Sequence, residues 1–125
     1  MNTSKKGYNK ELECRKILEK QGYKIVFKSI RWRWGTLDYA GLFDSIFVRN
    51  GVENQEPVKQ RLHVSNKHLG DFNYYLPHQA TIRAFKEDFG LEGDLFQLWI
   101  WNKPRWVGRG VKKHWQKAQW QIINL

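Results

Sequence analysis

The stretch that decides the fold is residues 41–49, which read GLFDSIFVR. Its aromatic and β-branched side chains are typical of a strand. Two-residue alternation would place four of its side chains on one face of a sheet: Leu42, Asp44, Ile46 and Val48. Asp44 is the exception on that face, because an unpaired carboxylate among apolar side chains is costly. Such a carboxylate generally has a cation, a metal or a hydrogen-bond donor as its partner.

The charge balance of the chain indicates a polyanionic partner. Its 125 residues contain 22 Lys and Arg against 12 Asp and Glu, which gives a formal net charge of +10. Nucleic acid is the first such partner to expect, and the alternative is a basic protein without one. No apolar run approaches the roughly 20 residues of a membrane-spanning helix, so no membrane partner is expected.

The N-terminus and the cysteine content bear on the cellular compartment. The first residues, MNTSKK, lack the apolar core of a signal peptide. Cys14 is the only cysteine, which excludes an internal disulfide and a cysteine-cluster zinc site. Both features fit a reducing compartment, so we expect a cytoplasmic protein, in the host cell if the chain is viral.

Local signals along the chain predict the element order α-β-β-β-α-β-β. A first helix is expected from Asn9 to Gln21, ended by Gly22, with a frayed segment at residues 1–8. Strands are expected at 23–27, 42–49, 58–65, 95–101 and 119–125, a second helix at 75–89, a loop at 29–39 and a turn at Asn50-Gly51. The strand at 95–101 is almost continuously apolar, which favours burial on both faces. This order predicts one α/β domain over residues 1–125, a mixed sheet flanked by helices.

Three side chains form a candidate metal site. Glu11 lies at the edge of the apolar face of the first helix, so it can point toward the sheet. If the strand at 58–65 lies beside Asp44, alternation lets His63 approach that carboxylate. Two carboxylates and a histidine suit Mg²⁺ or Mn²⁺, which would polarise a phosphate and lower the pKa of a bound water. The alternative is structural, with His63 exposed and Asp44 accepting ordinary hydrogen bonds.

The order helix-Glu, strand-Asp, strand-(E/Q)-x-K resembles the PD-(D/E)XK nuclease superfamily, and most closely the archaeal-type Holliday junction resolvases and related small phage nucleases. Glu11 matches the helix carboxylate of that family, and Asp44 matches its metal-binding aspartate. The resemblance implies a restriction-endonuclease-like three-layer sandwich and Mg²⁺- or Mn²⁺-dependent hydrolysis of phosphodiester bonds. It also implies a homodimer, because a symmetric four-way junction needs two cuts.

The third motif departs from the family pattern. The segment Leu62-His63-Val64-Ser65 stands where that motif is expected, so His63 falls on the Glu/Gln position and Ser65 on the Lys position. A histidine can bind a metal, but a serine cannot supply positive charge. Lys67 follows on the same face if the strand continues, and it could supply that charge; Lys59 could supply it from the other side.

Two basic segments are candidate nucleic-acid surfaces. The first lies before the Asp44 strand and combines cations with large rings: Lys28, Arg31, Trp32, Arg33 and Trp34. The second follows Asp94, after which the chain has no acidic residue, and includes Arg105, Arg109, Lys112 and Lys113 beside Trp106. Contacts to phosphates position a protein without reading bases, so we expect recognition of branched or double-stranded DNA by shape.

Two functions follow from these observations. The first is a metal-dependent, structure-selective DNA endonuclease of the Holliday junction resolvase type. The second is a catalytically degenerate protein with the nuclease fold that binds nucleic acid without cutting it, because the third motif is altered. A nuclease directed at RNA and a protein-interaction module stay open as further alternatives.

Overall fold

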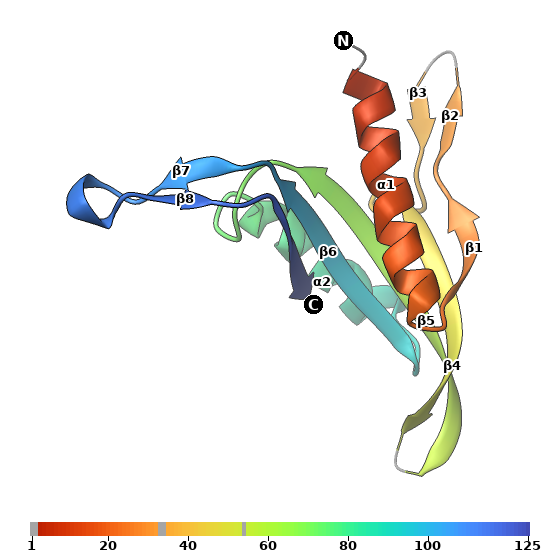
Figure 1. The fold of residues 1–125 in the computed structure, drawn as a ribbon. Coiled ribbons are helices and arrows are strands. Elements are labelled where there is room, and N and C mark those ends of the chain that lie inside the picture. The colour runs from red at the N-terminus through yellow and green to blue at the C-terminus, as the bar shows by residue number, and fades with distance from the viewer. Residues whose placement is uncertain (1–2, 33–34, 54) are drawn as a thin grey trace.

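Five strands form the central sheet of the computed structural model, and a helix lies on each of its faces (Figure 1). The structure describes residues 3–32, 35–53 and 55–125, and for residues 3–8, 31, 32, 35–37, 53, 105 and 107 it describes the backbone alone. The order along the chain is α1 (Thr3–Lys20), β1 (Lys24–Lys28), β2 (Ile30–Trp32), β3 (Gly35–Leu37), β4 (Ser45–Glu53), β5 (Glu56–His68), α2 (Leu76–Phe89), β6 (Asp94–Asn102), β7 (Arg105–Val107), η1 (Gly110–Lys112), β8 (His114–Gln116) and β9 (Gln119–Asn124).

The sheet is mixed, with the strand order β1-β4-β5-β6-β9. β4 is antiparallel to both β1 and β5, β5 and β6 are parallel, and β9 is antiparallel to β6. The parallel pair is connected through α2, as a crossover requires. The carboxyl ends of β1, β5 and β6 therefore lie at the same end of the sheet.

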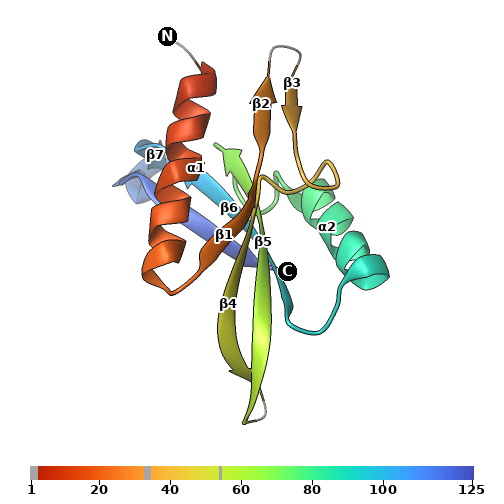
Figure 2. The ribbon, with the colours of Figure 1, turned by 90° about the vertical axis from the view of Figure 1, so that its right-hand side faces the viewer.

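The two helices cover opposite faces of the sheet (Figure 2). α1 places Cys14 and Leu18 against Leu62, Val64 and other side chains of one face. α2 places the fully buried Ile82 against the other face, together with two aromatic residues, Phe43 and Phe96. The α/β class with a mixed sheet flanked by helices is thus confirmed.

β6 is buried on both faces, as its apolar run predicts. Trp99 faces α1 and belongs to the same core as Leu18. Phe96 and Leu98 lie in the cores on the other face. The apolar sequence of β6 is continuous because the core under α1 covers one face of this strand and the core under α2 covers the other.

The structure corrects two expected boundaries. The first helix begins at Thr3, so residues 3–8 are helical and not frayed. Asn50-Gly51 is not a turn, because both residues are paired within β4, with Lys59 and Val58. The chain reverses beyond Glu53, where Gln55 adopts a positive φ of 66°. Continuing β4 to Glu53 extends the ladder with β5, which outweighs the local turn preference of Asn-Gly.

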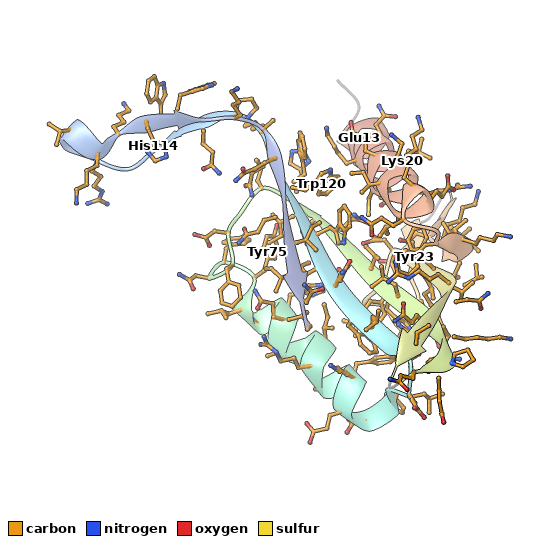
Figure 3. The ribbon with its side chains drawn as sticks, turned by 60° about the horizontal axis from the view of Figure 1, so that its bottom comes forward. Glu13, Lys20, Tyr23, Tyr75, His114 and Trp120 are labelled. Atoms are coloured by element: carbon orange, nitrogen blue, oxygen red, sulfur yellow. The ribbon has the colours of Figure 1, made fainter. Side chains whose placement is uncertain are left out.

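Two small hairpins lie outside the central sheet. The segment expected as a loop at 29–39 contains the antiparallel pair β2–β3. Between β6 and β9 the chain forms a second pair, β7–β8, which we call the arm (residues 103–118). The arm projects from the sheet (Figure 1), and Figure 3 shows His114 on it, away from the helices. In the part of the chain that the structure describes, no helix has the length and apolarity needed to cross a membrane.

Candidate functional site

Asp44 lies directly before β4, so the expected alternation from Leu42 to Val48 does not include it. Its backbone N–H donates to the carbonyl of Val64 at 2.9 Å, and its own carbonyl accepts the N–H of Ser29 at 2.7 Å. Its carboxylate Oδ2 accepts the backbone N–H of Asn66 at 2.5 Å. Asp44 is thereby fixed where β1, β4 and β5 meet.

The surroundings of Asp44 raise its pKa from 3.8 to about 7. Burial is the largest cause, because it disfavours the charged carboxylate. The negative charges of Glu11 and Asp38 raise the pKa further, whereas the Asn66 N–H and the positive charge of Lys67 lower it. Asp44 is therefore a buried carboxyl group that changes its charge near neutral pH and would be stabilised as an anion by a nearby cation.

Cys14 and Asn66 are neighbours of Asp44 that the sequence analysis did not assign to the site. Burial, followed by the charges of Asp44 and Glu11, raises the pKa of the Cys14 thiol to about 12. The Asn66 side chain lowers that pKa. Neither polar atom of the Asn66 carboxamide, Oδ1 or Nδ2, meets the geometry of a hydrogen bond with any described residue. The Asn66 carboxamide thus lies beside the Cys14 thiol without a well-formed hydrogen bond to a described residue, and a buried amide in this state is a candidate for binding a ligand.

Asp38 is a third carboxylate of this region that the sequence analysis missed. Its Oδ1 accepts the hydroxyl of Ser29 at 2.5 Å, and the same hydroxyl is 3.0 Å from the carbonyl of Asp44. Ser29 thus couples Asp38 to Asp44 across the entry to the β2–β3 hairpin. The sequence pattern does not predict this contact, because Asp38 and Asp44 both lie outside regular strands.

The structure places His63 away from Glu11 and Asp44, in contrast to the expected ligand set. His63 is buried on the α2 side, stacked on Phe96 at 4.5 Å between ring centroids and in edge contact with Phe43. Its Nδ1 lies 3.2 Å from the carbonyl of Leu95. Burial lowers the pKa of His63, and the charged groups that act on it are Asp94 and Arg61. The two-residue alternation is broken around Asp44, because Phe43 lies in the core on the α2 side and Phe47 in the core on the α1 side.

Ser65 and Lys67 occupy the carboxyl half of β5 with different surroundings. Ser65 is fully buried, and its hydroxyl lies 2.9 Å from Nε2 of His78 on α2. β5 continues to His68, so Lys67 is part of the strand. Lys67 lowers the pKa of both Asp44 and His78, although burial is the main cause for His78. The one cation of the predicted motif is therefore close enough to act on the buried carboxylate.

The donor set at Asp44 suits Mg²⁺ or Mn²⁺ in part. Among the described residues, no group of three His, Cys, Asp or Glu side chains could hold a metal ion. Two carboxylates are electrostatically coupled there, Glu11 and Asp44, and the Asn66 carboxamide supplies an oxygen without a partner. Mg²⁺ is commonly bound by one or two carboxylates together with water and substrate phosphate, so this oxygen-rich set fits it.

No family model matches the chain, and neither a curated protein nor a solved structure is significantly similar to it.

The arm carries most of the described basic candidates. Arg109, Lys112 and Lys113 are exposed, and Lys113 lies over the ring of Trp106 at 5.3 Å. Trp106 meets Trp115 edge to face with 5.5 Å between centroids, and both rings are more than half exposed. The arm therefore presents cations and aromatic rings together.

The other basic candidates are described in part. Lys28 is exposed at the end of β1. Arg31 and Trp32 lie in β2, and Arg105 lies in β7, each described by its backbone alone. Arg33 and Trp34 lie outside the described residues.

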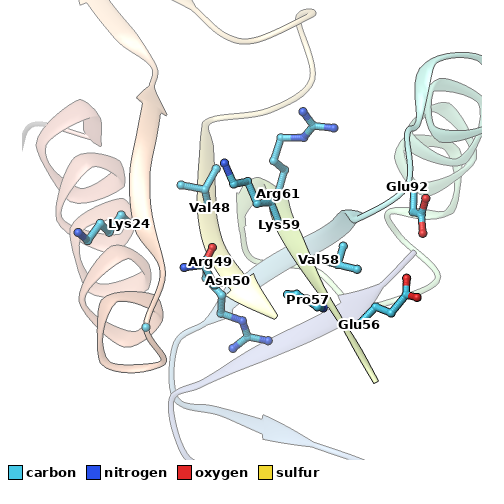
Figure 4. Close-up of a pocket in the computed structure, with 11 residues that line it drawn as sticks. Lys24, Val48, Arg49, Asn50, Glu56, Pro57, Val58, Lys59, Arg61 and Glu92 are labelled. Carbon is cyan, nitrogen blue, oxygen red and sulfur yellow. The ribbon is translucent and has the colours of Figure 1, made fainter. Parts of the chain in front are cut away.

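A cleft of about 860 Å³ lies at the other end of β4 and β5 (Figure 4). Its lining mixes four cations with two carboxylates: Lys24, Arg49, Lys59, Arg61, Glu56 and Glu92. Arg49 donates to Gln60 and lies over the Tyr23 ring, and Arg61 donates to Asp94. In Figure 4 the basic side chains diverge, so we assign the cleft no ligand.

Proposed function

We propose that this chain is a metal-dependent, structure-selective DNA endonuclease of the Holliday junction resolvase type. The observation that carries the proposal is the buried carboxylate of Asp44, held between three strands and coupled to Glu11 and Lys67. A structural carboxylate would be expected to have enough donors to lower its pKa, whereas this one has a raised pKa and two acidic neighbours.

Each residue of the site has a distinct role in this proposal. Glu11 and Asp44 hold Mg²⁺ or Mn²⁺, which supplies a polarised phosphate and a more acidic water when bound. Asn66 orients the Asp44 carboxylate through its backbone N–H. Lys67 neutralises charge that develops on the phosphate. His63 and Ser65 support the site through packing and hydrogen bonding and are not proposed as ligands.

The architecture supports a restriction-endonuclease-like sandwich. Its core elements, α1-β1-β4-β5-α2-β6-β9, follow the order that the family resemblance implies, and the two hairpins are additions to that core. Glu11 lies on α1 and Asp44 directly precedes β4, close to where the resemblance expects the two carboxylates, and Lys67 lies two residues beyond the expected lysine position, Ser65. This agreement supports the proposal through the fold, independently of the electrostatics of Asp44.

The DNA surface that we propose surrounds the same end of the sheet. The β2–β3 hairpin follows β1 and the arm follows β6, so both basic segments leave the sheet at the carboxyl ends of its strands. Bound phosphates at these segments would orient a branched duplex without reading its sequence. We propose a homodimer, because two symmetric cuts need two such sites.

A specific observation favours the second candidate, a protein that binds DNA without cutting it. The residue whose N–H binds Asp44 is an asparagine, Asn66, so β5 contributes no carboxylate next to Asp44. A protein whose site has a lower affinity for the metal would still bind junctions but would cut them slowly or not at all.

The experiment that tests the proposal uses a labelled four-way junction, a linear duplex of the same sequence and a single strand, each with Mg²⁺, Mn²⁺ or EDTA. We expect metal-dependent paired nicks on the junction. Asp44→Asn should abolish them and leave junction binding within a factor of about two, because binding rests on the basic segments. Glu13→Gln is the matched control for Glu11→Gln, since Glu13 lies on the exposed face of the same helix. Binding without nicks in any metal would support the second candidate.

A further inference from the structure

The loop that connects β5 to α2 (residues 69–75, the β5–α2 loop) directly follows the strand that carries Asn66 and Lys67. It begins two residues after Lys67, at the carboxyl end of β5. The N–H of Leu69 donates to the carbonyl of Trp101 at 2.8 Å, and the N–H of Gly70 donates to Oδ1 of Asn102 at 3.2 Å. The loop is therefore attached to the end of β6, where the arm begins.

Hydrogen bonds also fix the middle of the loop. The fully buried Gln79 of α2 donates through Nε2 to the carbonyl of Phe72 at 2.8 Å. The hydroxyl of Tyr75, which Figure 3 shows at the start of α2, donates to the carbonyl of Leu69 at 2.5 Å. Gly70 has a φ of 121°, and a Cβ there would lie 2.6 Å from the Tyr75 ring. The loop backbone is thus held in one conformation by side chains from within the fold.

This fixed loop nevertheless exposes large apolar side chains. Tyr74 is 72% exposed, and its ring meets Tyr75 edge to face at 4.9 Å, which orients it. Phe72 is 40% exposed, and Leu69 and Leu76 at the two ends of the loop are exposed to a similar extent. Folding gains nothing from rings left in water, so a rigid backbone that displays them is typical of a binding surface.

We propose that Tyr74 and Phe72 form a stacking platform for an unpaired nucleobase next to the Asp44 site. This inference rests on the proposed binding of DNA. A base is the occupant because the loop lies between two cationic features, Lys67 and the arm, in a chain of net charge +10, so a phosphate backbone held there brings its bases to the loop. Aromatic side chains stack on bases that are free of their own stack, as at bulges and branch points. The platform would select the branched region of the substrate.

The test compares Tyr74→Ala and Tyr74→Phe, with Phe89→Ala as the matched control. Phe89 is an aromatic residue 67% exposed at the far end of α2. The probes are a duplex with a single bulged 2-aminopurine and the same duplex fully paired, and the readouts are 2-aminopurine fluorescence and the dissociation constant. The wild type should quench the bulged base. Tyr74→Ala should bind the bulged duplex about fivefold to a hundredfold more weakly than the wild type and quench its fluorescence less. It should bind the paired duplex as the wild type does. Tyr74→Phe and Phe89→Ala should resemble the wild type in both readouts.

Four results would overturn the inference. Equal losses for Tyr74→Ala and Phe89→Ala, or equal losses on both duplexes, would remove the platform while leaving the proposed function in place. A fall in oligomer mass for Tyr74→Ala in sedimentation would assign the loop to a second copy of the chain. Absence of wild-type binding to both duplexes and to a four-way junction would refute the proposed function itself, together with the platform.

Discussion

Asp44→Asn should stabilise the protein at alkaline pH. The wild-type carboxyl has its pKa raised to about 7 from 3.8, so the folded state resists ionisation that the unfolded state undergoes freely. Each unit of pKa difference between the folded and unfolded states corresponds to about 1.36 kcal/mol. Above pH 7 the raised pKa of Asp44 therefore lowers the free energy of unfolding by roughly 4 kcal/mol. Asparagine has no charge to bury, and its side-chain oxygen can still accept the N–H of Asn66.

The raised pKa of Asp44 determines the pH range over which the stability of the wild type changes. The folded state retains the Asp44 proton up to about pH 7, so the wild type loses stability as the pH rises from about 4 to about 7. Between pH 5 and pH 8 this loss amounts to roughly 2–3 kcal/mol. His63 and His78 have lowered pKa values and act in the opposite direction, because their stability contribution is lost as the pH falls below 6.5. Comparing variant with wild type cancels the histidines.

The assay is urea unfolding followed by tryptophan fluorescence at pH 5, 6, 7 and 8 in EDTA. The free energy of unfolding of Asp44→Asn minus that of the wild type should grow by roughly 2–3 kcal/mol across this range. Asp88→Asn, which changes an exposed carboxylate of α2, should follow the wild type. Parallel curves for the wild type and Asp44→Asn would refute the reasoning, because they would mean that Asp44 ionises as easily in the folded chain as in the unfolded one.

Three further predictions test the Cys14 thiol, the core and the glycine that follows α1. Cys14 should resist a thiol reagent at pH 8 until the chain unfolds, because burial raises its pKa to about 12; fast labelling of the folded protein would contradict this. Phe47→Ala should lower the free energy of urea unfolding by about 3–5 kcal/mol, since the ring is fully buried, and Val52→Ala, at a side chain 70% exposed, should change it by less than about 0.5 kcal/mol. Gly22→Ala should lower the free energy of unfolding by about 1–2 kcal/mol, because Gly22 has a φ of +91°, which residues with a side chain rarely adopt. No described atom lies within 4 Å of an added Cβ, so the expected cost is backbone strain and not a clash. An unchanged melting temperature would be inconsistent with that conformation.

Much of the fold could be predicted because most elements have strong periodic patterns. The second helix, expected at 75–89, forms at Leu76–Phe89, and the apolar strand expected at 95–101 lies within Asp94–Asn102. The prediction of a turn at Asn50-Gly51 was wrong. The local preference of Asn-Gly for a turn contributes little free energy, and it competes with the pairing of β4 and β5 along their whole length. The small hairpin within 29–39 was missed for a related reason, since three-residue strands leave almost no periodic signal.

The site was less predictable than the fold because it depends on register. With the reversal beyond Glu53, Asp44 lies beside Val64 and Asn66, so the expected pairing with His63 is displaced. Alternation correctly separates Leu62 and Val64 from His63, but it cannot say on which side of the sheet Asp44 emerges. The positions of Glu11 on the first helix and of Lys67 in the third expected strand could be predicted, because one follows from a helical pattern and the other from continuation of a strand.

The arm has a consequence for how the chain could diversify. It leaves β6 after Asn102 and re-enters at Gln119, and these two residues are themselves paired in the sheet. The segment between them is therefore an insertion closed at its base by one rung of the ladder, so its length and composition can change without shifting the register of the strands. Related chains could exchange this segment for another of different reach or charge, and a designer could replace it with a short turn to obtain the scaffold alone.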